Sequence, residues 1–170
     1  MLYPGVTWGW CEKPINSSIM KLYVVYFRTM QDSPEVEIRI VTADQKVAKE
    51  KLREVKKEER EWMKDEDEDS GNWAEAKMCA IDINNDLAVG DVVVIVTFTL
   101  WHECVETTLT AHKDLDAAEA YIADEKRKLK ADYEGISPFY EDVSFDDSLH
   151  LADDSVMVDA YFGIAEFDVI

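Results

Sequence analysis

The chain has 170 residues, and its 37 Asp and Glu side chains outnumber 18 Lys and Arg, which gives a formal net charge of −19 at pH 7. Hydrophobic residues make up 47% of the sequence, which is typical of a packed globular protein and excludes a disordered tail. The charge disfavours direct binding to nucleic acid or to an anionic membrane surface, and it favours basic protein surfaces as partners. Acidity also keeps proteins soluble, so a functional and a merely solubilising role both stay open.

The cysteines and the apolar runs indicate the cellular compartment. Cys11, Cys79 and Cys104 are odd in number and widely spaced, which is typical neither of a disulfide framework nor of a zinc site. The longest apolar run, Val92–Val96, is far shorter than the roughly 20 residues of a membrane helix. The N-terminus lacks the residue order of a signal peptide. We therefore expect a cytoplasmic protein without a membrane span.

The same order of elements occurs twice after an irregular extension over residues 1–19, which contains two prolines and two glycines. The first stretch predicts strands over Lys21–Met30 and Glu35–Val41, a helix over Thr42–Lys64 and a strand over Trp73–Ile83. The second stretch predicts strands over Val92–Leu100 and Glu103–Leu109, a helix from about Asp114 to Tyr133 and, after a long acidic loop, a strand over Ser155–Ile170.

Each predicted helix has a start signal and an apolar stripe. Thr42 with Gln45 fits a capping box for the first helix, and Asp114 is a good N-cap for the second. The buried stripe of the first helix is expected to contain Ala48, Leu52, Val55 and Trp62. The stripe of the second is expected to contain Leu115, Ala118, Ile122, Leu129 and Tyr133.

The alignment of EVEIRIVTA at 35–43 with ECVETTLTA at 103–111 predicts an internal duplication. The expected fold is α+β, with two tandem ββαβ units over 20–90 and 91–170 that form one compact body. A mainly antiparallel sheet would be covered by two long helices, and the two units would share a core or extend one sheet. A right-handed crossover places the third strand of a unit parallel to the second, in the order 2-1-3.

The first unit contains K-L-Y-V-V-Y-F, a hairpin, V-T-A, a helix of mixed charge and a closing strand. This pattern resembles small ββαβ proteins of unknown function that are frequent in phage and prophage genomes. Here the resemblance covers most of residues 20–170 as two fused copies. It implies a phage-like or mobile-element origin and carries over no catalytic residue.

The acidic run Asp65–Asp69 begins like a calcium loop. An EF-hand needs Gly at its sixth position and Glu at its twelfth, whereas this sequence has Ser70 and Ala76 there. The run is therefore interpreted as a solvated loop, and no metal site is predicted.

Catalytic motifs are missing from the sequence. His102 and Cys104 form the one close His and Cys pair, but nothing nearby supplies a third catalytic member or an oxyanion hole. His112 and His150 stand alone and are expected to be surface or cap residues. Because the sequence also lacks the common nucleotide, hydrolase and zinc motifs, we expect a non-enzymatic protein without a cofactor.

The acidic clusters between each helix and its closing strand are the predicted partner-binding residues. If the two units are related by a two-fold axis, these loops form two matching patches that dock on a basic protein surface, expected to belong to a host protein. In the sharpest form, the protein mimics nucleic acid and inhibits a host nucleic-acid-binding or defence protein. The predicted residues are Asp65, Glu66, Asp67, Glu68, Asp69, Glu141, Asp142, Asp146, Asp147, Asp153 and Asp154.

Two alternatives stay open. The protein is a small-ligand-binding or sequestering module with a cleft between the two repeats, or it forms a homodimer through exposed edge strands. The aromatic side chains that would line such a cleft are Tyr23, Tyr26, Phe27, Trp73 and Phe98.

Overall fold

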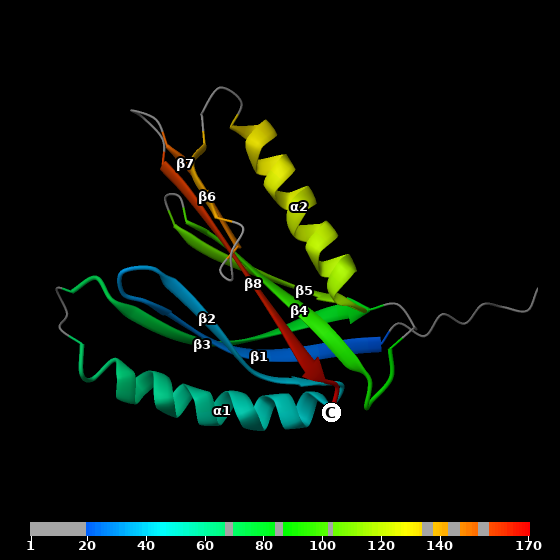
Figure 1. Ribbon diagram of the computed structural model, residues 1–170. Helices are drawn as coiled ribbons and strands as arrows, with labels where there is room; N and C mark the ends of the chain where they lie inside the picture. The colour runs from blue at the N-terminus through cyan, green and yellow to red at the C-terminus, as the bar shows by residue number, and fades with distance from the viewer. Residues whose placement is uncertain are drawn as a thin grey trace, which may run out of the picture.

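The computed structural model describes residues 20–66, 70–83, 87–101, 104–133, 138–142, 147–152 and 157–170. These residues form two helices and eight strands (Figure 1). The helices are α1 (Gln45–Trp62) and α2 (Leu115–Asp132). The strands are β1 (Met20–Met30), β2 (Pro34–Thr42), β3 (Trp73–Ile83), β4 (Val92–Trp101), β5 (Val105–His112), β6 (Pro138–Asp142), β7 (Asp147–Ala152) and β8 (Met157–Asp168).

The elements are stacked in four layers. A three-stranded sheet has the order β2-β1-β3, and a five-stranded sheet has the order β5-β4-β8-β7-β6. All neighbouring strands are antiparallel. Helix α1 covers the outer face of the three-stranded sheet, and α2 covers the outer face of the five-stranded sheet (Figure 1). The inner faces of the two sheets pack against each other.

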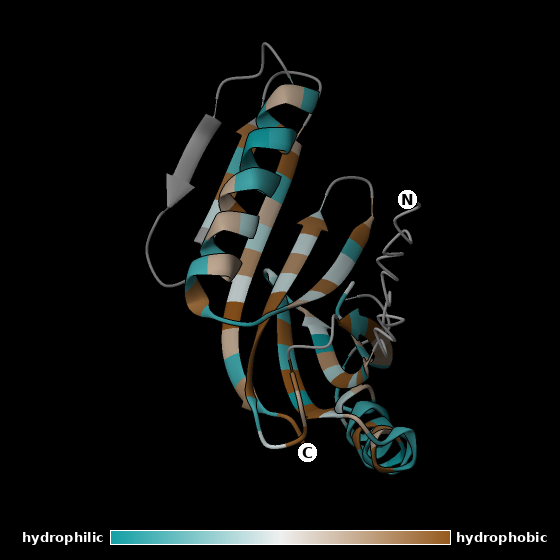
Figure 2. Cartoon of the chain, turned by 90° about the vertical axis from the view of Figure 1, so that its right-hand side faces the viewer, coloured by the Kyte–Doolittle hydropathy of each residue, from teal (hydrophilic) through white to brown (hydrophobic). Residues whose placement is uncertain are grey.

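The central strands β1 and β4 are buried on both faces, which explains their almost continuous apolar sequences. On β1, Leu22 and Val24 face the other sheet, whereas Val25 packs against α1. On β4, Ile95 faces the three-stranded sheet, and Val96 packs in the cluster under α2. Figure 2 shows the resulting alternation of hydrophobic and hydrophilic bands along the strands.

The observed sheets confirm part of the predicted fold and correct the rest. The fold is α+β and antiparallel, and the first sheet has the predicted order 2-1-3. Of the two arrangements left open for the halves of the chain, a shared core and one extended sheet, the structure has the shared core, because two sheets lie face to face. A single sheet covered by helices on one face would leave its other apolar face in water, and stacking removes that cost.

The long acidic loop predicted before the last strand is wrong, because it contains β6 and β7. Leu149 and Leu151 alternate along β7 and are at most 1% exposed, so this short segment has the period of a half-buried strand. Its flanking Asp residues concealed that pattern. Both strands are short, at five and six residues.

The start of α1 differs from the predicted capping box. Asp44 is the N-cap, and its carboxylate accepts a hydrogen bond from the Lys46 amide at 2.7 Å. Thr42 is fully buried, and its hydroxyl accepts from the Asp44 amide and donates to the Ile170 carbonyl. The short side chain of Asp44 reaches the orphan amides of the first turn, while Thr42 remains in the strand.

The apolar stripes are confirmed except at one position. Ala48 and Val55 of α1 are fully buried, with Leu52 and Trp62 packed beside them. In α2, Ala118, Ile122 and Leu129 are buried and Tyr133 packs against them, but Leu115 is 45% exposed. Asp114 caps α2 as predicted, since its carboxylate accepts from the Ala117 amide at 2.8 Å. Within the described part of the chain, neither helix is long and apolar enough to cross a membrane.

The shared core between the sheets can be tested with two adjacent valines on β4. Val93 points into that core and is fully buried, whereas Val92 is 49% exposed. We expect Val93→Ala to lower the free energy of unfolding by about 2–3 kcal/mol, because it removes two buried methyl groups and leaves a cavity. Val92→Ala is the matched control, with an effect below about 0.5 kcal/mol. Equal effects in urea unfolding would contradict the face-to-face packing.

Candidate functional site

The two sheets are joined at one corner by the end of the chain. The Ala43 amide donates to the Ile170 carbonyl at 2.9 Å, and the Ile170 amide donates to the Val41 carbonyl at 3.4 Å. This pattern is that of a parallel bridge between Ile170 and Thr42. Val169 still pairs with Gly90 and Asp91 next to β4, and Ile170 alone pairs with the outer edge of β2.

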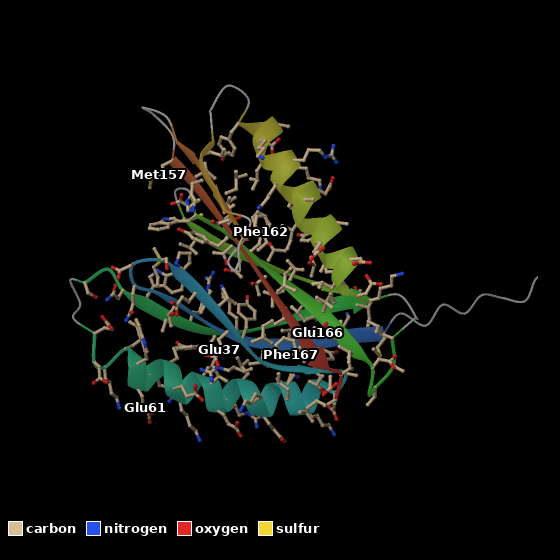
Figure 3. All side chains as sticks on the ribbon, viewed as in Figure 1. Glu37, Glu61, Met157, Phe162, Glu166 and Phe167 are labelled. Carbon is tan, nitrogen blue, oxygen red and sulfur yellow. The ribbon has the colours of Figure 1, made fainter. Side chains whose placement is uncertain are left out.

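From this corner β2 and β8 separate toward their N-terminal ends (Figure 1). Side chains of the two sheets line a groove there. The narrow part has a volume of about 260 Å³ and contains Glu37 of β2 and Phe167 of β8, both labelled in Figure 3. The wide part has a volume of about 570 Å³. Its walls are residues 33–37 on one side and Thr97, Thr99, Ser148 and residues 161–163 on the other.

Gly163 lets two strands approach closely in the wall of the groove. A Cβ atom at this position would lie 2.6 Å from Thr97 Oγ1, so a larger residue would displace the Thr97 side chain. The Thr97 hydroxyl donates to the Gly163 carbonyl at 3.4 Å. The packing against Thr97 therefore requires glycine at this position. Because Gly163 has no side chain, the surface of the five-stranded sheet is low at this point of the groove wall.

Arg28 links the two sheets beside the groove. Its side chain is 12% exposed, and its Nε donates to Glu75 of β3 at 2.9 Å. One terminal nitrogen donates to the Val105 carbonyl and to the Thr107 hydroxyl of β5, both at 3.3 Å. The guanidinium also lies over the Trp73 ring, at 4.9 Å from its centre. These contacts hold β1 and β3 at a fixed separation from β5.

The contacts of Arg28 are connected to the groove by the hydroxyl groups of Thr107 and Thr99. Thr107 contacts Thr99 at 3.2 Å between their oxygens, and Thr99 lines the wide part of the groove. Burial acts to raise the pKa of Glu75, but hydrogen bonds from Arg28 and Lys77 outweigh it and hold the pKa below its ordinary value. The Glu75 carboxylate is therefore charged at neutral pH and anchors the arginine.

His150 and Asp159 form a second polar pair on the inner face of the five-stranded sheet. They lie opposite each other on β7 and β8, with Nδ1 and Oδ1 2.5 Å apart. The Tyr161 ring meets the imidazole edge-on at 5.6 Å between ring centres. Burial, and then the charge of Asp159, raises the pKa of Tyr161. The pair fixes the orientation of the imidazole ring.

The expectation that His112 and His150 are surface or cap residues is wrong. His150 is partly buried in β7 against Asp159. His112 ends β5, its Nε2 lies 2.8 Å from the Thr110 hydroxyl, and burial lowers its pKa. No sequence signal paired His150 with Asp159, because their register depends on the hairpin between β7 and β8.

The predicted acidic residues fall in three settings. Asp65 is exposed after α1, whereas Glu66 is partly buried and accepts from Asn72 at 2.7 Å and from Gln31 at 3.4 Å. Glu66 therefore stabilises the segment before β3 through these hydrogen bonds, and its carboxylate is less available to bind a partner protein. Glu141 and Asp142 lie in β6 and Asp147 lies in β7, so their placement in a loop is wrong. Asp67, Glu68, Asp69, Asp146, Asp153 and Asp154 lie outside the described residues.

The five aromatic residues proposed for a cleft do not line one. Tyr23 and Phe27 pack in the cluster under α1, and Tyr26 lies between the sheets. Phe98 stacks on Phe162 in the cluster under α2, with ring centres 4.8 Å apart. Trp73 lies under Arg28. The strand period separates these residues onto opposite faces, which their spacing in sequence did not show.

The sulfur and metal chemistry of the described residues is sparse. Cys104 is exposed directly before β5, where its Sγ lies 3.8 Å from the Glu106 carboxylate. Burial raises the pKa of Cys79, which makes its thiol less reactive. His102 and Cys11 lie outside the described residues. Among the residues described, no group of three His, Cys, Asp or Glu side chains could hold a metal ion.

The negative charge is concentrated in the second half of the chain. Residues 84–170 contain 20 acidic and five basic side chains, and the basic ones lie on α2 or directly before it. Lys113 pairs with Asp114 at 3.7 Å, and Lys128 pairs with Asp124 at 3.0 Å. The residues that line the groove include two glutamates and no lysine or arginine.

No family model matches the chain, and neither the curated proteins nor the solved structures gave a match. The resemblance to phage-type ββαβ proteins therefore stays a prediction.

The role of Arg28 can be tested by its replacement with methionine, which keeps the side-chain length but removes the charge. We expect Arg28→Met to lower the free energy of unfolding at pH 7 by about 1–3 kcal/mol, because Glu75 keeps only Lys77 as a charged partner and the Val105 carbonyl loses its donor from Arg28. Arg53→Met, on the exposed side of α1, is the control and should change it by less than about 0.5 kcal/mol.

The same variant has a characteristic pH dependence. Since the pKa of Glu75 is lowered in the folded state, the pair contributes stability above the ordinary glutamate pKa of about 4.3 and loses it as the pH falls through the lower folded value. The stability difference between wild type and Arg28→Met should therefore shrink between about pH 5 and pH 3. A constant difference in denaturant titrations over that range would show that the charge pair contributes nothing.

Proposed function

We propose that this chain is a non-enzymatic, acidic protein-interaction module that binds a basic surface of another protein. The observation that carries the proposal is the uneven charge. Residues 84–170 contain 20 acidic and five basic side chains, and α2 already pairs three of those five, Lys113, Arg127 and Lys128, with its own carboxylates. The strands of the five-stranded sheet are left with surplus negative charge.

Such a surface attracts cationic partners and repels nucleic acid. Complementary charge raises the rate of association and selects among partners, and exposed pairs at the rim contribute little affinity each. At physiological ionic strength the screening length is about 8 Å, so the partner must bring its basic groups into close contact. The complex is therefore expected to be sensitive to salt.

We further propose that the two sheets derive from tandem ββαβ units. The supporting feature is that each sheet contains a hairpin followed by a helix and a closing strand, in the orders β2-β1-β3 and β5-β4-β8. The hairpin β6–β7 then extends the second unit. Two units packed through their inner faces create the groove, which neither unit has alone.

The sharper form of the proposal is a phage-type inhibitor of a host nucleic-acid-binding or defence protein. DNA presents about one charge per 1.7 Å of helix axis, so mimicry needs carboxylates in rows. Several described carboxylates are committed to internal pairs, including Glu75 with Arg28 and Glu58 with Arg39. Mimicry would therefore depend on the acidic positions within 65–69 and 141–154.

The groove favours one second candidate, a small-ligand-binding or sequestering module. Its wide part, about 570 Å³, lies in the range of about 300–1,000 Å³ that is common for ligand sites. Native mass spectrometry of the purified chain distinguishes this function, since a retained small molecule would add a defined mass. Variants in which surface Asp and Glu residues are replaced by Asn and Gln should retain the same added mass.

The interaction function can be tested by removal of three carboxylates from the strand-rich acidic region. The test variant is Asp142→Asn, Asp153→Asn and Asp154→Asn. The control removes three charges from the self-neutralised helix α1 by Glu50→Gln, Glu54→Gln and Glu61→Gln. Binding is measured with a basic protein that is first captured from the source organism at low salt and then purified.

We expect the dissociation constant of the test variant to be about fivefold or more higher than that of wild type, and that of the control variant to rise much less. A change from about 0.1 M to 1 M salt, which shortens the Debye length from about 10 Å to 3 Å, should release the complex. A partner that binds the test variant as tightly as wild type, or that resists salt, would contradict the proposal.

A further inference from the structure

We propose that the groove holds an extended, basic segment of the partner, which adds as a strand to the outer edge of β2. This inference rests on the interaction function proposed above and names the chemistry of the partner.

Strand β2 has an edge that is open to pairing. It is the terminal strand of the three-stranded sheet, with β1 on its other side. Among the described residues, backbone bonds on its outer side join Ile170 to Val41 and Ala43. The outer edge over 34–38 borders the groove. An edge of this kind accepts an extended peptide through main-chain hydrogen bonds.

The end of the chain shows how a strand binds there. Ile170 lies beside Thr42 in a parallel bridge, at the closed end of the groove. A guest strand placed farther along β2 would continue this pairing toward the open end at residues 33–35. Five residues of edge, 34–38, correspond to roughly 17 Å of extended chain, which suits a peptide of five or six residues.

The side chains of β2 specify an alternating guest sequence. Val36 and Ile38 face the five-stranded sheet, whereas Glu35 and Glu37 are exposed on the other face of β2. Glu37 also pairs with Arg39 at 3.2 Å, an exposed contact that a basic guest residue would compete with. Cross-strand neighbours on one face interact directly. The guest residues beside Glu35 and Glu37 should therefore be basic, and the alternate ones should be apolar residues that pack toward Thr97 and the shallow surface at Gly163.

The same charges disfavour a second copy of this chain as the occupant. If two β2 strands paired edge to edge, Glu35 and Glu37 of one copy would approach the same carboxylates of the other. Like charges opposite each other destabilise a strand pair. Sedimentation at high protein concentration should therefore show a monomer, and a dimer that Glu35→Lys abolishes would overturn the proposed occupant.

The probe is a labelled peptide, Lys-Val-Lys-Val-Lys-Val, and binding is followed by fluorescence anisotropy. Two controls carry N-methyl groups on the lysine amides or on the valine amides, with side chains and charge unchanged. In a strand, alternate amides point to opposite edges, so one methylated peptide should lose at least about tenfold in affinity and the other should bind like the parent.

Protein variants locate the site. Glu35→Lys with Glu37→Lys reverses the two groove carboxylates and is expected to weaken peptide binding by at least about tenfold. Glu50→Lys with Glu54→Lys makes the same change in net charge on the exposed side of α1 and should alter affinity less than about twofold. Circular dichroism confirms that both variants are folded.

The outcomes separate the two proposals. If both protein variants lose peptide affinity equally, or if all three peptides bind equally well, strand addition is overturned. The interaction function is upheld in that case if the purified basic protein still binds in a salt-sensitive way. If neither the peptide nor any basic protein binds, both proposals fail. Selective loss with one methylated peptide and with the Glu35 and Glu37 variant supports the groove site.

Discussion

The structure depends on the burial of the inner faces of both sheets against each other. Strands β1 and β4 carry apolar side chains on both faces, so each needs a helix on one side and another sheet on the other. Neither half of the chain could cover both faces of its own sheet with its single helix. The two halves are therefore one cooperative body, and the orientation of the sheets is set by the core between them.

The same contact produces the groove. The sheets are joined at the corner where Ile170 pairs beside Thr42, and they separate toward the β1–β2 turn. Arg28 maintains the spacing because it donates to Glu75 in one sheet and to Val105 in the other. The edge strand β2, which carries Glu35 and Glu37, thus borders the groove, and the five-stranded sheet forms its other wall. The net charge then favours a cationic occupant, and the open edge of β2 favours an extended one.

The sequence predicted the elements with clear periodicity and missed those that depend on distant contacts. The bounds of β3 and the burial of Ala48, Val55 and Ile122 followed from local patterns. Strands β6 and β7 were missed because they are short and surrounded by Asp residues. A cleft between the two repeats was among the predicted alternatives, but its lining was missed: its walls come from residues 33–37 and 161–163, and nothing local in either segment indicates that they meet.

The central claim is that a basic partner segment pairs with the edge of β2 between the sheets. Hydrogen exchange of the backbone amides, measured with and without the bound partner, tests it most directly. The account predicts slower exchange at residues 35–38 on binding, with little change along the exposed side of α1. Protection confined to the helices, or spread evenly over the surface, would contradict it.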